Sequence, residues 1–342
     1  MVPLLKKPFS SFSSLQKLTL QRLTRTLSYV SGERRSFEEV SAESKSSFIH
    51  PTAVVHPNAV IDQDVTVGPF CTVGSMVRIG KACKLYPGSH IFGDTELGER
   101  CTLMTGAIVG EDIPGRTTIG CNNTIGYHAV VGVKCQDMKY KPGSDCFLDI
   151  GDNNEIREYT SIHRSSKSSD RTVISDNNLI MGSCHIAHDC KLGSNIILAN
   201  NTLIAGHVVV GDYAHTAGAV VVHQFCHLGS HSFIGGGSVV SQDVPKYMMV
   251  TGDRADLRGL NLEGLRRRGF SSEEVKGMRR AYQKIFMPVD GKLGGIEDRL
   301  AEVEQTKELA MLDVVCSMVQ SIRDSFKQDR RGICKFRHWS GS

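Results

Sequence analysis

Residues 174–210 read ISDNNL IMGSCH IAHDCK LGSNII LANNTL IAGHVV V, and an aliphatic residue returns at every sixth position of this stretch. Side chains along a strand alternate between two faces, so a period of six equals three strand repeats and can point one residue of each hexad inward. The pattern predicts one short strand and one turn per hexad. A repeat of this kind is typical of a solenoid, whose coils are stable only when they stack on their neighbours.

The same period runs outward from this stretch over most of the chain. With the aliphatic residue taken as the first place of the hexad, there are 29 such anchor positions, and only Thr216 among them is not aliphatic. The anchors are Ile49, Val55, Ile61, Val67, Val73, Ile79, Leu85, Ile91, Leu97, Leu103, Val109, Ile119, Ile125, Val131, Ile150, Ile156, Ile162, Ile174, Ile180, Ile186, Leu192, Leu198, Ile204, Val210, Thr216, Val222, Leu228, Ile234 and Val240. Three hexads close one triangular coil, so the sequence predicts a mainly β protein, a parallel β-helix of nearly ten coils.

Six cysteines share the fifth place of a hexad, where a small buried side chain is expected. They are Cys71, Cys83, Cys101, Cys184, Cys190 and Cys226. Small core thiols explain this placement better than disulfides or zinc, because the chain has no Cys-x-x-Cys pair. A reducing compartment is the expected setting.

The period is interrupted where loops are expected to leave the coil. Four residues are extra around Glu111–Arg116, and a polar loop, Lys134–Gly143, follows the anchor Val131. The Ser-rich segment Arg164–Asp170 keeps the phase, and we expect it to bulge outward. Loops that leave a rigid scaffold often carry function.

The hexads stop at Val240, and the pattern beyond it becomes helical. Ser271 and Glu274 form a predicted capping box of a helix that Pro288 would end, and a second long helical stretch is expected from about 296 to 326. The predicted organisation is a leader and linker over residues 1–47, a hexapeptide-repeat domain over 48–245 and a C-terminal helical domain over 246–342.

The first 32 residues hold five basic residues and no acid, and they are rich in Ser and Leu. Read as a helix, Leu20, Leu23 and Leu27 share one side, which is typical of an organellar transit peptide and favours the mitochondrion over the chloroplast. A plain basic tail is the alternative. The rest of the chain has 35 basic and 36 acidic residues, which argues against general nucleic-acid binding. No apolar run approaches the ~18 residues of a transmembrane helix.

Histidines gather around one anchor of the repeat. His185 and His188 flank Ile186, while His207 lies one coil further on and His163 one coil before. Such a cluster has two functional interpretations, a general base that is neutral near pH 7 and a zinc site shared between subunits. The alternative to both functions is that these histidines lie at corners of the coil and make only structural hydrogen bonds.

The neighbours of these histidines favour polar chemistry on a substrate. Asp189 could orient His188 as a base, and Gly206 leaves a backbone N–H open to a developing oxyanion. His223 and Gln224 open a hexad two coils further on.

A basic run lies between the repeats and the helices. Residues 254–284 hold nine basic and four acidic side chains, with Arg266, Arg267 and Arg268 in succession. A solvated charged face is the usual meaning of such a run. Because arginine suits bidentate phosphate contacts, a phosphate-bearing substrate or an acidic carrier protein is the functional alternative.

Several motifs within this framework carry a family resemblance over residues 48–337. They are QDMKY (136–140), IHR (162–164), HIAHDC (185–190), LANN (198–201), AGH (205–207), HQFC (223–226) and NLEGLRRRGF (261–270). Together they resemble the UDP-N-acetylglucosamine acyltransferases, which perform the first step of lipid A biosynthesis. The resemblance implies a left-handed parallel β-helix with a helical C-terminal domain, a homotrimer, and active sites at subunit interfaces. The leader suggests a eukaryotic organellar version.

The resemblance also implies roles for individual residues. His188 would be the general base, with Asp189 as its orienting partner and Gly206 as the oxyanion donor. The residues that would line the sugar and acyl site are Gln136, Asp137, Lys139, His163, His185, His207, His223 and Gln224. The residues that would hold the nucleotide are Asn261, Glu263, Arg267 and Arg268. Gly236 would set the length of the acyl chain, and Arg254 departs from the family, which often has histidine there.

The implied reaction is direct. The 3-hydroxyl of UDP-N-acetylglucosamine loses its proton to His188 and attacks the thioester of (R)-3-hydroxyacyl-acyl carrier protein. We expect no Ser or Cys nucleophile and no metal or organic cofactor. Two alternatives stay open at this point: a zinc protein like the gamma-type carbonic anhydrases, and a non-catalytic scaffold or carrier-binding subunit.

Overall fold

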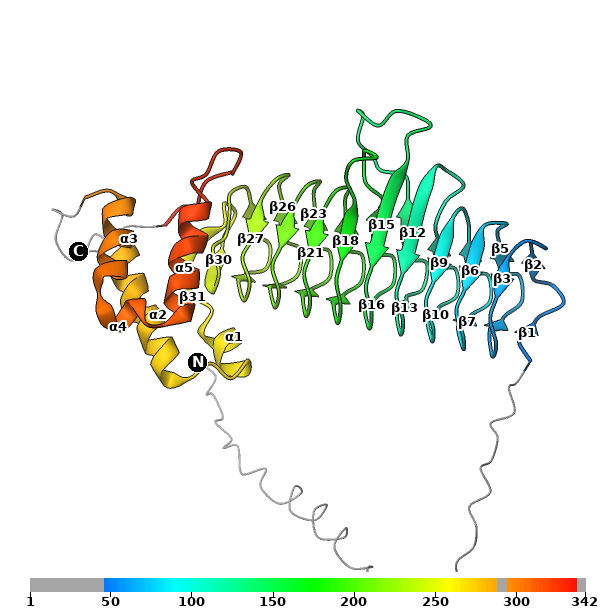
Figure 1. Cartoon of the computed structure of the whole chain (residues 1–342), viewed down its shortest axis with the longest axis horizontal. Coiled ribbons are helices and arrows are strands. Elements are labelled where there is room, and N and C mark those ends of the chain that lie inside the picture. Colours follow the sequence, from blue (N-terminus) through cyan, green and yellow to red (C-terminus); the bar gives the residue numbers. More distant parts are fainter. Residues whose placement is uncertain (1–45, 288–293, 337–342) are drawn as a thin grey trace, which may run out of the picture. The chain divides into compact units, whose positions relative to one another are not determined.

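The protein is a parallel β-helix followed by a group of helices (Figure 1). The structure, a computed structural model, describes residues 46–287 and 294–336. All of them lie within one compact unit, Ser44–Ser342. The predicted mainly β fold with a helical C-terminal part is confirmed. The predicted transit peptide lies outside the described residues.

Each coil of the β-helix gives one strand to each of three sheets, here named A, B and C. Sheet A contains β1 (Phe48–Ile49), β4 (Thr66–Val67), β7 (Lys84–Leu85), β10 (Thr102–Leu103), β13 (Thr124–Ile125), β16 (Glu155–Ile156), β19 (Leu179–Ile180), β22 (Ile197–Leu198), β25 (His215–Thr216), β28 (Phe233–Ile234), β30 (Met248–Thr251) and β31 (Asp256–Leu260). Sheet B contains β2 (Val54–Val55), β5 (Thr72–Val73), β8 (His90–Ile91), β11 (Ile108–Val109), β14 (Val130–Val133), β17 (Ser161–His163), β20 (His185–Ile186), β23 (Leu203–Ile204), β26 (Val221–Val222) and β29 (Val239–Val240). Sheet C contains β3 (Val60–Ile61), β6 (Val77–Ile79), β9 (Thr95–Leu97), β12 (Gly115–Ile119), β15 (Cys146–Ile150), β18 (Thr172–Ile174), β21 (Lys191–Leu192), β24 (Val209–Val210) and β27 (His227–Leu228).

Every predicted anchor lies in one of the strands β1–β29, so the six-residue period is confirmed along its whole length. From Val67 onward all anchors are buried, whereas Ile49 in the first coil is exposed. The exceptional anchor Thr216 is also buried, and its hydroxyl lies 2.8 Å from the hydroxyl of Thr202. The six cysteines of the fifth hexad place are buried as predicted.

The loop after β14 leaves the coil as predicted, but the Ser-rich segment does not bulge over its whole length. Arg164, Ser165 and Ser166 are buried, and only residues 167–169 are exposed. The Arg164 guanidinium donates to Thr117 Oγ1 at 2.9 Å and to the Glu111 carbonyl at 3.3 Å, which ties this segment to the earlier insertion. Long-range contacts of this kind leave no trace in a local pattern.

The helical part contains α1 (Leu262–Arg267), α2 (Ser272–Phe286), α3 (Ile296–Gln305), α4 (Lys307–Ala310) and α5 (Asp313–Asp324). The predicted capping box at the start of α2 is present, with Ser271 and Glu274 bonded reciprocally. Pro288 lies outside the described residues. Among the described helices, none is long and apolar enough to cross a membrane.

The stretch predicted to be helical over residues 296–326 is helical over most of its length, but it consists of three helices. Thr306 and Leu312 have extended backbone angles, with ψ of 100° and 110°, and they divide this stretch into α3, α4 and α5. The breaks let all three helices pack against α2, which one straight helix could not do. The predicted end of the repeat domain at residue 245 remains a prediction. Strand β30 pairs with β28, so sheet A continues beyond that residue.

Candidate active site

Three consecutive strands of sheet B bring the predicted histidines together. In the register of the sheet, Ser161 of β17, His185 of β20 and Leu203 of β23 lie side by side, with the anchors of the same strands turned inward. His188 and Asp189 follow β20 at the corner where the chain turns toward sheet C. Asp189 has φ of 61°, a left-handed conformation that Asp tolerates better than most residues.

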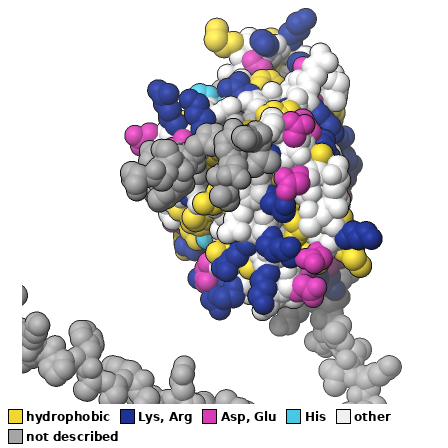
Figure 2. Space-filling model, turned by 90° about the vertical axis from the view of Figure 1, so that its left-hand side faces the viewer, with side chains coloured by type: hydrophobic (Ala, Val, Ile, Leu, Met, Phe, Trp, Pro, Cys, Tyr) yellow, Lys and Arg dark blue, Asp and Glu magenta, His cyan; other side chains and the backbone are white. Residues whose placement is uncertain are grey.

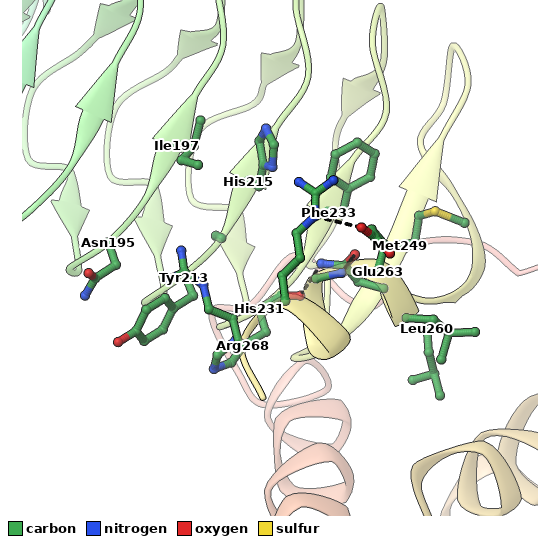
Figure 3. Close-up of a pocket in the computed structure, with 15 residues that line it drawn as sticks. Asn195, Ile197, Tyr213, His215, His231, Phe233, Met249, Leu260, Glu263 and Arg268 are labelled. Atoms are coloured by element: carbon green, nitrogen blue, oxygen red, sulfur yellow. Dashed lines mark hydrogen bonds and ion pairs between the residues drawn. The ribbon is translucent and has the colours of Figure 1, made fainter. Parts of the chain in front are cut away.

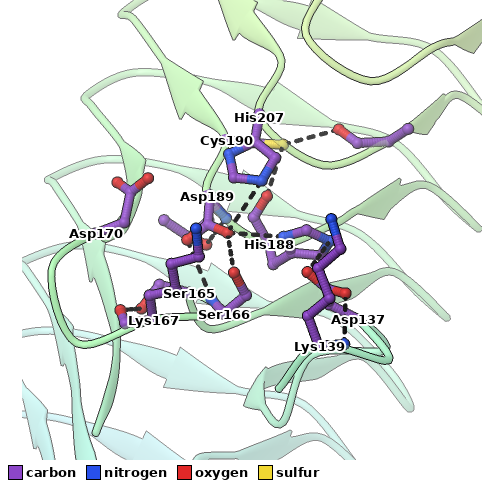
Figure 4. Close-up of polar contacts among 12 residues, drawn as sticks. Asp137, Lys139, Ser165, Ser166, Lys167, Asp170, His188, Asp189, Cys190 and His207 are labelled. Atoms are coloured by element: carbon purple, nitrogen blue, oxygen red, sulfur yellow. Dashed lines mark hydrogen bonds and ion pairs between the residues drawn. The ribbon is translucent and has the colours of Figure 1, made fainter. Parts of the chain in front are cut away.

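The central contact of this corner joins His188 to Asp189 (Figure 4). His188 Nδ1 lies 2.7 Å from Asp189 Oδ2, and both residues are buried. Burial alone would raise the pKa of the Asp189 carboxyl, but hydrogen bonds from His188 and Ser166 outweigh it and lower that pKa. Because the ionised carboxylate can only accept, Nδ1 of neutral His188 carries the proton and Nε2 keeps its lone pair.

A pocket of about 500 Å³ opens in front of this pair. The predicted site residues that line it are Gln136, Asp137, Lys139, His163, His185, His188, Gly206 and Gln224. Burial and the nearby His185 and His188 rings lower the pKa of His163 to about 4, and burial also lowers the pKa of His185. Both rings are therefore neutral near pH 7. Nδ1 of buried His163 has no hydrogen-bond partner among the described residues, so it can serve a ligand.

The loop after β14 closes one side of the pocket. Asp137 Oδ1 accepts the N–H of Lys139 at 2.8 Å, which holds the loop in a tight turn. Asp137 Oδ2 then lies 4.0 Å from His188 Nε2. The loop thus places a carboxylate beside the nitrogen that would accept a proton, and Lys139 also lines the pocket.

Gly206 lies directly against the ring of His188. A Cβ atom at this position would come within 2.5 Å of His188 Cε1 and 2.7 Å of Nε2, so only glycine leaves room for the imidazole. Among the described residues, none accepts a hydrogen bond from the Gly206 N–H.

His207 lies on the other side of the pair rather than in the pocket. Its ring is edge-on to His188, with 5.2 Å between centroids, and stacks on Phe225 at 4.6 Å. His188, Asp189 and His207 place three possible metal-ligand atoms within 4.8 Å of one another. However, both Asp189 oxygens already accept hydrogen bonds from Ser166, and Oδ2 also accepts one from His188, so this carboxylate is engaged as a partner of the histidine.

A second pocket, of about 680 Å³, lies beside α1 and sheet A (Figure 3). Asn261, Glu263, Arg267 and Arg268 line it together with Tyr213, His215, His231 and Phe233. The Arg268 guanidinium lies 4.5 Å from the centroid of the Tyr213 ring, and Arg267 is paired with Glu263 at 2.7 Å. The Asn261 side chain is used by the protein itself, because it accepts from the Gly264 N–H and donates to the His231 carbonyl.

The two pockets belong to different edges of the β-helix. In the coil of β24, His207 precedes the strand of sheet C, and Tyr213 follows it. Six residue steps separate the two corners, a span of at most about 20 Å. His188 lines only the first pocket and Arg268 only the second, so one chain does not bring them to a common pocket.

Three of the remaining residues that the sequence singled out lie outside both pockets. His223 is exposed at the corner after β26, next to Gln224. Gly236 is exposed at the corner between sheets A and B, and Arg254 is exposed between β30 and β31. None of these three lines either pocket in the single chain.

Sequence reasoning missed Ser166, which hydrogen-bonds Asp189, and the aromatic residues of the second pocket. The repeat indicates that Ser166 is buried, because this serine occupies the fifth place of the hexad that begins at Ile162, where small buried side chains recur. Tyr213 and His231 share the fourth place in successive coils, and their rings stack at 4.9 Å.

A β-helix of hexapeptide repeats with a helical end and a polar pocket on its side defines the class of hexapeptide transferases. A family model described as "Bacterial transferase hexapeptide (six repeats)" matches residues 171–206, and one described as "Udp N-acetylglucosamine O-acyltransferase; Domain 2" matches residues 243–334.

The relatives narrow this class. A protein of Arabidopsis thaliana named "Probable acyl-[acyl-carrier-protein]--UDP-N-acetylglucosamine O-acyltransferase, mitochondrial" is 64% identical over 100% of this chain and 99% of its own length. An acyl-[acyl-carrier-protein]--UDP-N-acetylglucosamine O-acyltransferase of Stutzerimonas stutzeri is 40% identical, over 65% of this chain and 82% of its own. The crystal structure of Arabidopsis UDP-N-acetylglucosamine acyltransferase covers 84% of this chain and 100% of its own, with 70% identity and a TM-score of 0.83. The chain belongs to the UDP-N-acetylglucosamine O-acyltransferase family.

Proposed function

We propose that this protein transfers an (R)-3-hydroxyacyl chain from acyl carrier protein to the 3-hydroxyl of UDP-N-acetylglucosamine, the first step of a lipid A-type biosynthesis. The observation that carries the proposal is the 2.7 Å contact between His188 Nδ1 and Asp189 Oδ2. It leaves Nε2 free to accept a proton at the pocket. Membership of the family supplies the substrate class.

In the proposed reaction, the sugar 3-hydroxyl gives its proton to His188 Nε2 while its oxygen attacks the thioester carbonyl carbon. The Asp189 carboxylate stabilises the imidazolium that forms. As the tetrahedral intermediate collapses, the C–S bond breaks, and the carrier thiolate takes the proton back from His188. The products are the acylated sugar nucleotide and the free carrier thiol. The Gly206 N–H is the donor proposed for the negative oxygen of the intermediate.

The buried cysteines support direct transfer rather than a covalent acyl-enzyme. Cys184 and Cys190 are the thiols nearest to His188 in the sequence, and both are buried in the coil. Burial raises the pKa of Cys184 to about 11 and that of Cys190 to about 12, so neither thiolate is populated near pH 7.

A homotrimer accounts for the separation of the two pockets. His188 lies at one corner of sheet C and Arg268 beside the other, so a neighbouring copy related by rotation can place its Arg268 near this chain's His188. A ring of three such head-to-tail contacts closes on itself. The complete site would then lie between subunits, with the base from one chain and the nucleotide pocket from the next.

The helical end offers charges for both phosphorylated partners. Arg268 and Arg267 would contact the diphosphate of the sugar nucleotide. Lys and Arg side chains are spread over this end of the molecule (Figure 2). Among them, Arg266, Lys276 and Arg279 line a shallow groove between α1 and α2, which suits an acidic carrier protein.

We also infer a mitochondrial location, with the matrix as the compartment. The basic, acid-free leader supports it, as does the printed name of the Arabidopsis relative. The buried, unpaired thiols of the repeat fit a reducing matrix.

The direct test supplies the purified protein with UDP-N-acetylglucosamine and a series of 3-hydroxyacyl-carrier thioesters. Wild type should form the 3-O-acyl sugar, and His188→Ala should lose about 10²–10⁴-fold in kcat, the usual cost of removing a general base. His56→Ala, which changes an exposed histidine of the first coil, is the matched control and should retain activity. Activity of His188→Ala close to wild type would refute the assignment. Stoichiometric zinc, with carbon dioxide hydration in place of acyl transfer, would support the carbonic anhydrase alternative.

A further inference from the structure

Ser166 touches the histidine–aspartate pair although no motif singled it out. Its N–H donates to Asp189 Oδ1 at 3.0 Å, and its Oγ–H donates to Asp189 Oδ2 at 2.6 Å (Figure 4). One residue thus holds both oxygens of the carboxylate. Ser166 is 4% exposed and Asp189 is 3% exposed, so bulk water does not compete for these contacts.

The oxygen held by the Ser166 hydroxyl is the same one that faces His188. Asp189 Oδ2 accepts from Ser166 Oγ at 2.6 Å and from His188 Nδ1 at 2.7 Å. A carboxylate held at both oxygens cannot turn about its Cβ–Cγ bond, and the direction of Oδ2 sets the plane of the imidazole. We propose that Ser166 is a positioning residue for acyl transfer, which fixes the Asp189 carboxylate so that His188 presents Nε2 to the pocket.

The chain builds a rigid support for Ser166. The Ser165 N–H donates to the Phe147 carbonyl at 2.9 Å, and Ser165 Oγ accepts the Phe147 N–H at 2.9 Å. The backbone of Asp189 is held independently, because its N–H donates to Thr172 Oγ1 at 2.9 Å. The serine and the aspartate therefore approach each other from two coils that are each fixed by their own contacts, and the 2.6 Å contact does not depend on a mobile loop.

This inference rests on the proposed function, and its first test is kinetic. Ser166→Ala removes the Oγ–H and keeps the N–H, so kcat should fall about ten- to a hundredfold, the usual factor for a hydrogen bond to a charged group. KM for UDP-N-acetylglucosamine should stay nearly constant, because Ser166 does not line the pocket. Ser166→Thr keeps a hydroxyl and should restore most of the lost turnover.

The pH profile distinguishes positioning from a purely structural role. Without the serine hydroxyl, the charge of Asp189 acts more fully on His188 and favours the imidazolium, so the acid limb of kcat/KM should move to higher pH. The other titratable groups around the pair remain in place in this variant. Asp137, His163 and His185 face His188, and His207, Cys135 and Cys190 lie around Asp189.

Ser89→Ala is the matched control, because it changes a buried serine at the same hexad place whose hydroxyl contacts the Cys71 thiol and not Asp189. It should leave kcat and the pH profile unmoved. The inference is overturned if Ser89→Ala shifts the profile as Ser166→Ala does, or if Ser166→Thr is as impaired as Ser166→Ala.

A measurement without substrate separates this inference from the proposed function. The Cε1–H resonance of His188, followed by NMR in ¹³C-histidine-labelled trimer, reports the pKa of this ring directly. We expect a higher pKa in Ser166→Ala than in wild type. An identical titration in both proteins would overturn the role of Ser166, whereas absence of turnover in wild type with a shifted titration would refute only the proposed function.

Discussion

Gly206, which has no side chain, determines where the ring of the proposed base His188 can lie. The ring of His188 rests on the backbone of Gly206, at a distance that a Cβ atom would close to 2.5 Å. The glycine is not needed for an unusual backbone conformation, since Gly206 is not among the residues with positive φ. Its role is to leave space for the ring, and its N–H has no acceptor among the described residues.

We predict that Gly206→Ala moves the His188 ring and breaks its contact with Asp189. A displacement of about 1 Å can cost on the order of 100-fold in rate, so kcat should fall at least that far while the fold is retained. Gly218→Ala is a control for the folding cost of a methyl group at the same hexad place, because its Cβ would lie 3.5 Å from the nearest atom, the Asn200 carbonyl oxygen. Turnover kinetics and thermal melting of both variants check this, and a fully active Gly206→Ala enzyme would contradict it.

At the scale of elements, α1 and its C-cap residue Arg268 present three successive arginines to different surroundings. Arg266 pairs with Glu263 and faces the shallow groove, Arg267 pairs with Glu263 in the second pocket, and Arg268 lies over Tyr213. The short helix is fixed by the Asn261 cap, which is bonded to the β-helix through the His231 carbonyl. The orientation of the arginines is therefore set by the last coils.

If this helix holds the diphosphate, Arg267→Ala and Arg268→Ala should raise KM for UDP-N-acetylglucosamine more than they lower kcat. A hydrogen bond to a charged group is worth about 1.5–3 kcal/mol, which corresponds to roughly 10- to 100-fold in KM. The larger effect is expected for Arg268, whose guanidinium is not paired with Glu263. Arg266→Ala is the control on the same helix and should leave KM for the sugar nucleotide unchanged. Wild-type KM values in all three variants would contradict this role. The three arginines would then form only a solvated charged surface.

The corner between sheets A and B tests the proposed control of acyl length. A Cβ atom at Gly236 would lie 3.3 Å from the Gly218 carbonyl oxygen and 3.7 Å from Ala217 Cβ, so a side chain can project outward with little adjustment. We predict that Gly236→Met shifts the optimum of kcat/KM to shorter acyl donors, because each methylene that is no longer buried costs about 0.8 kcal/mol. A donor series with both proteins measures this. An unchanged optimum in a folded, active variant would remove Gly236 from this role.

The strands were predictable from sequence because each strand and its turn are encoded by six consecutive residues. The aliphatic anchor of each hexad marks the position of the strand. The contacts of Arg164 with Thr117 and of Ser166 with Asp189 were not, because they join residues 47 and 23 positions apart through the stacking of coils. His188 and Asp189 could be paired in advance because they are adjacent. The break at Thr306 goes with packing of the helices against α2. The helical spacing of apolar residues in the sequence gives no information about this packing.

At the scale of the whole molecule, the two pockets share no lining residue within one chain, which makes subunit mixing a decisive test. His188→Ala and Arg268→Ala should each be nearly inactive at low UDP-N-acetylglucosamine. In every mixed trimer of the two variants, one interface in three takes an intact His188 from one chain and an intact Arg268 from the next, so about a third of the wild-type activity should reappear. The co-expressed chains would carry two different tags, and mixed trimers would be isolated through both.

A pairing of His188→Ala with Asp189→Ala is the control, because both changes damage the same corner and no interface regains an intact base pair. Its mixed trimers should remain inactive, which excludes contaminating wild-type enzyme as the source of any recovery. If the site were built within one chain, each subunit of the first mixture would still lack either the base or the arginine. The mixture would then show only the average of its inactive parents, and the shared-site trimer would be refuted even if each single variant behaved as expected.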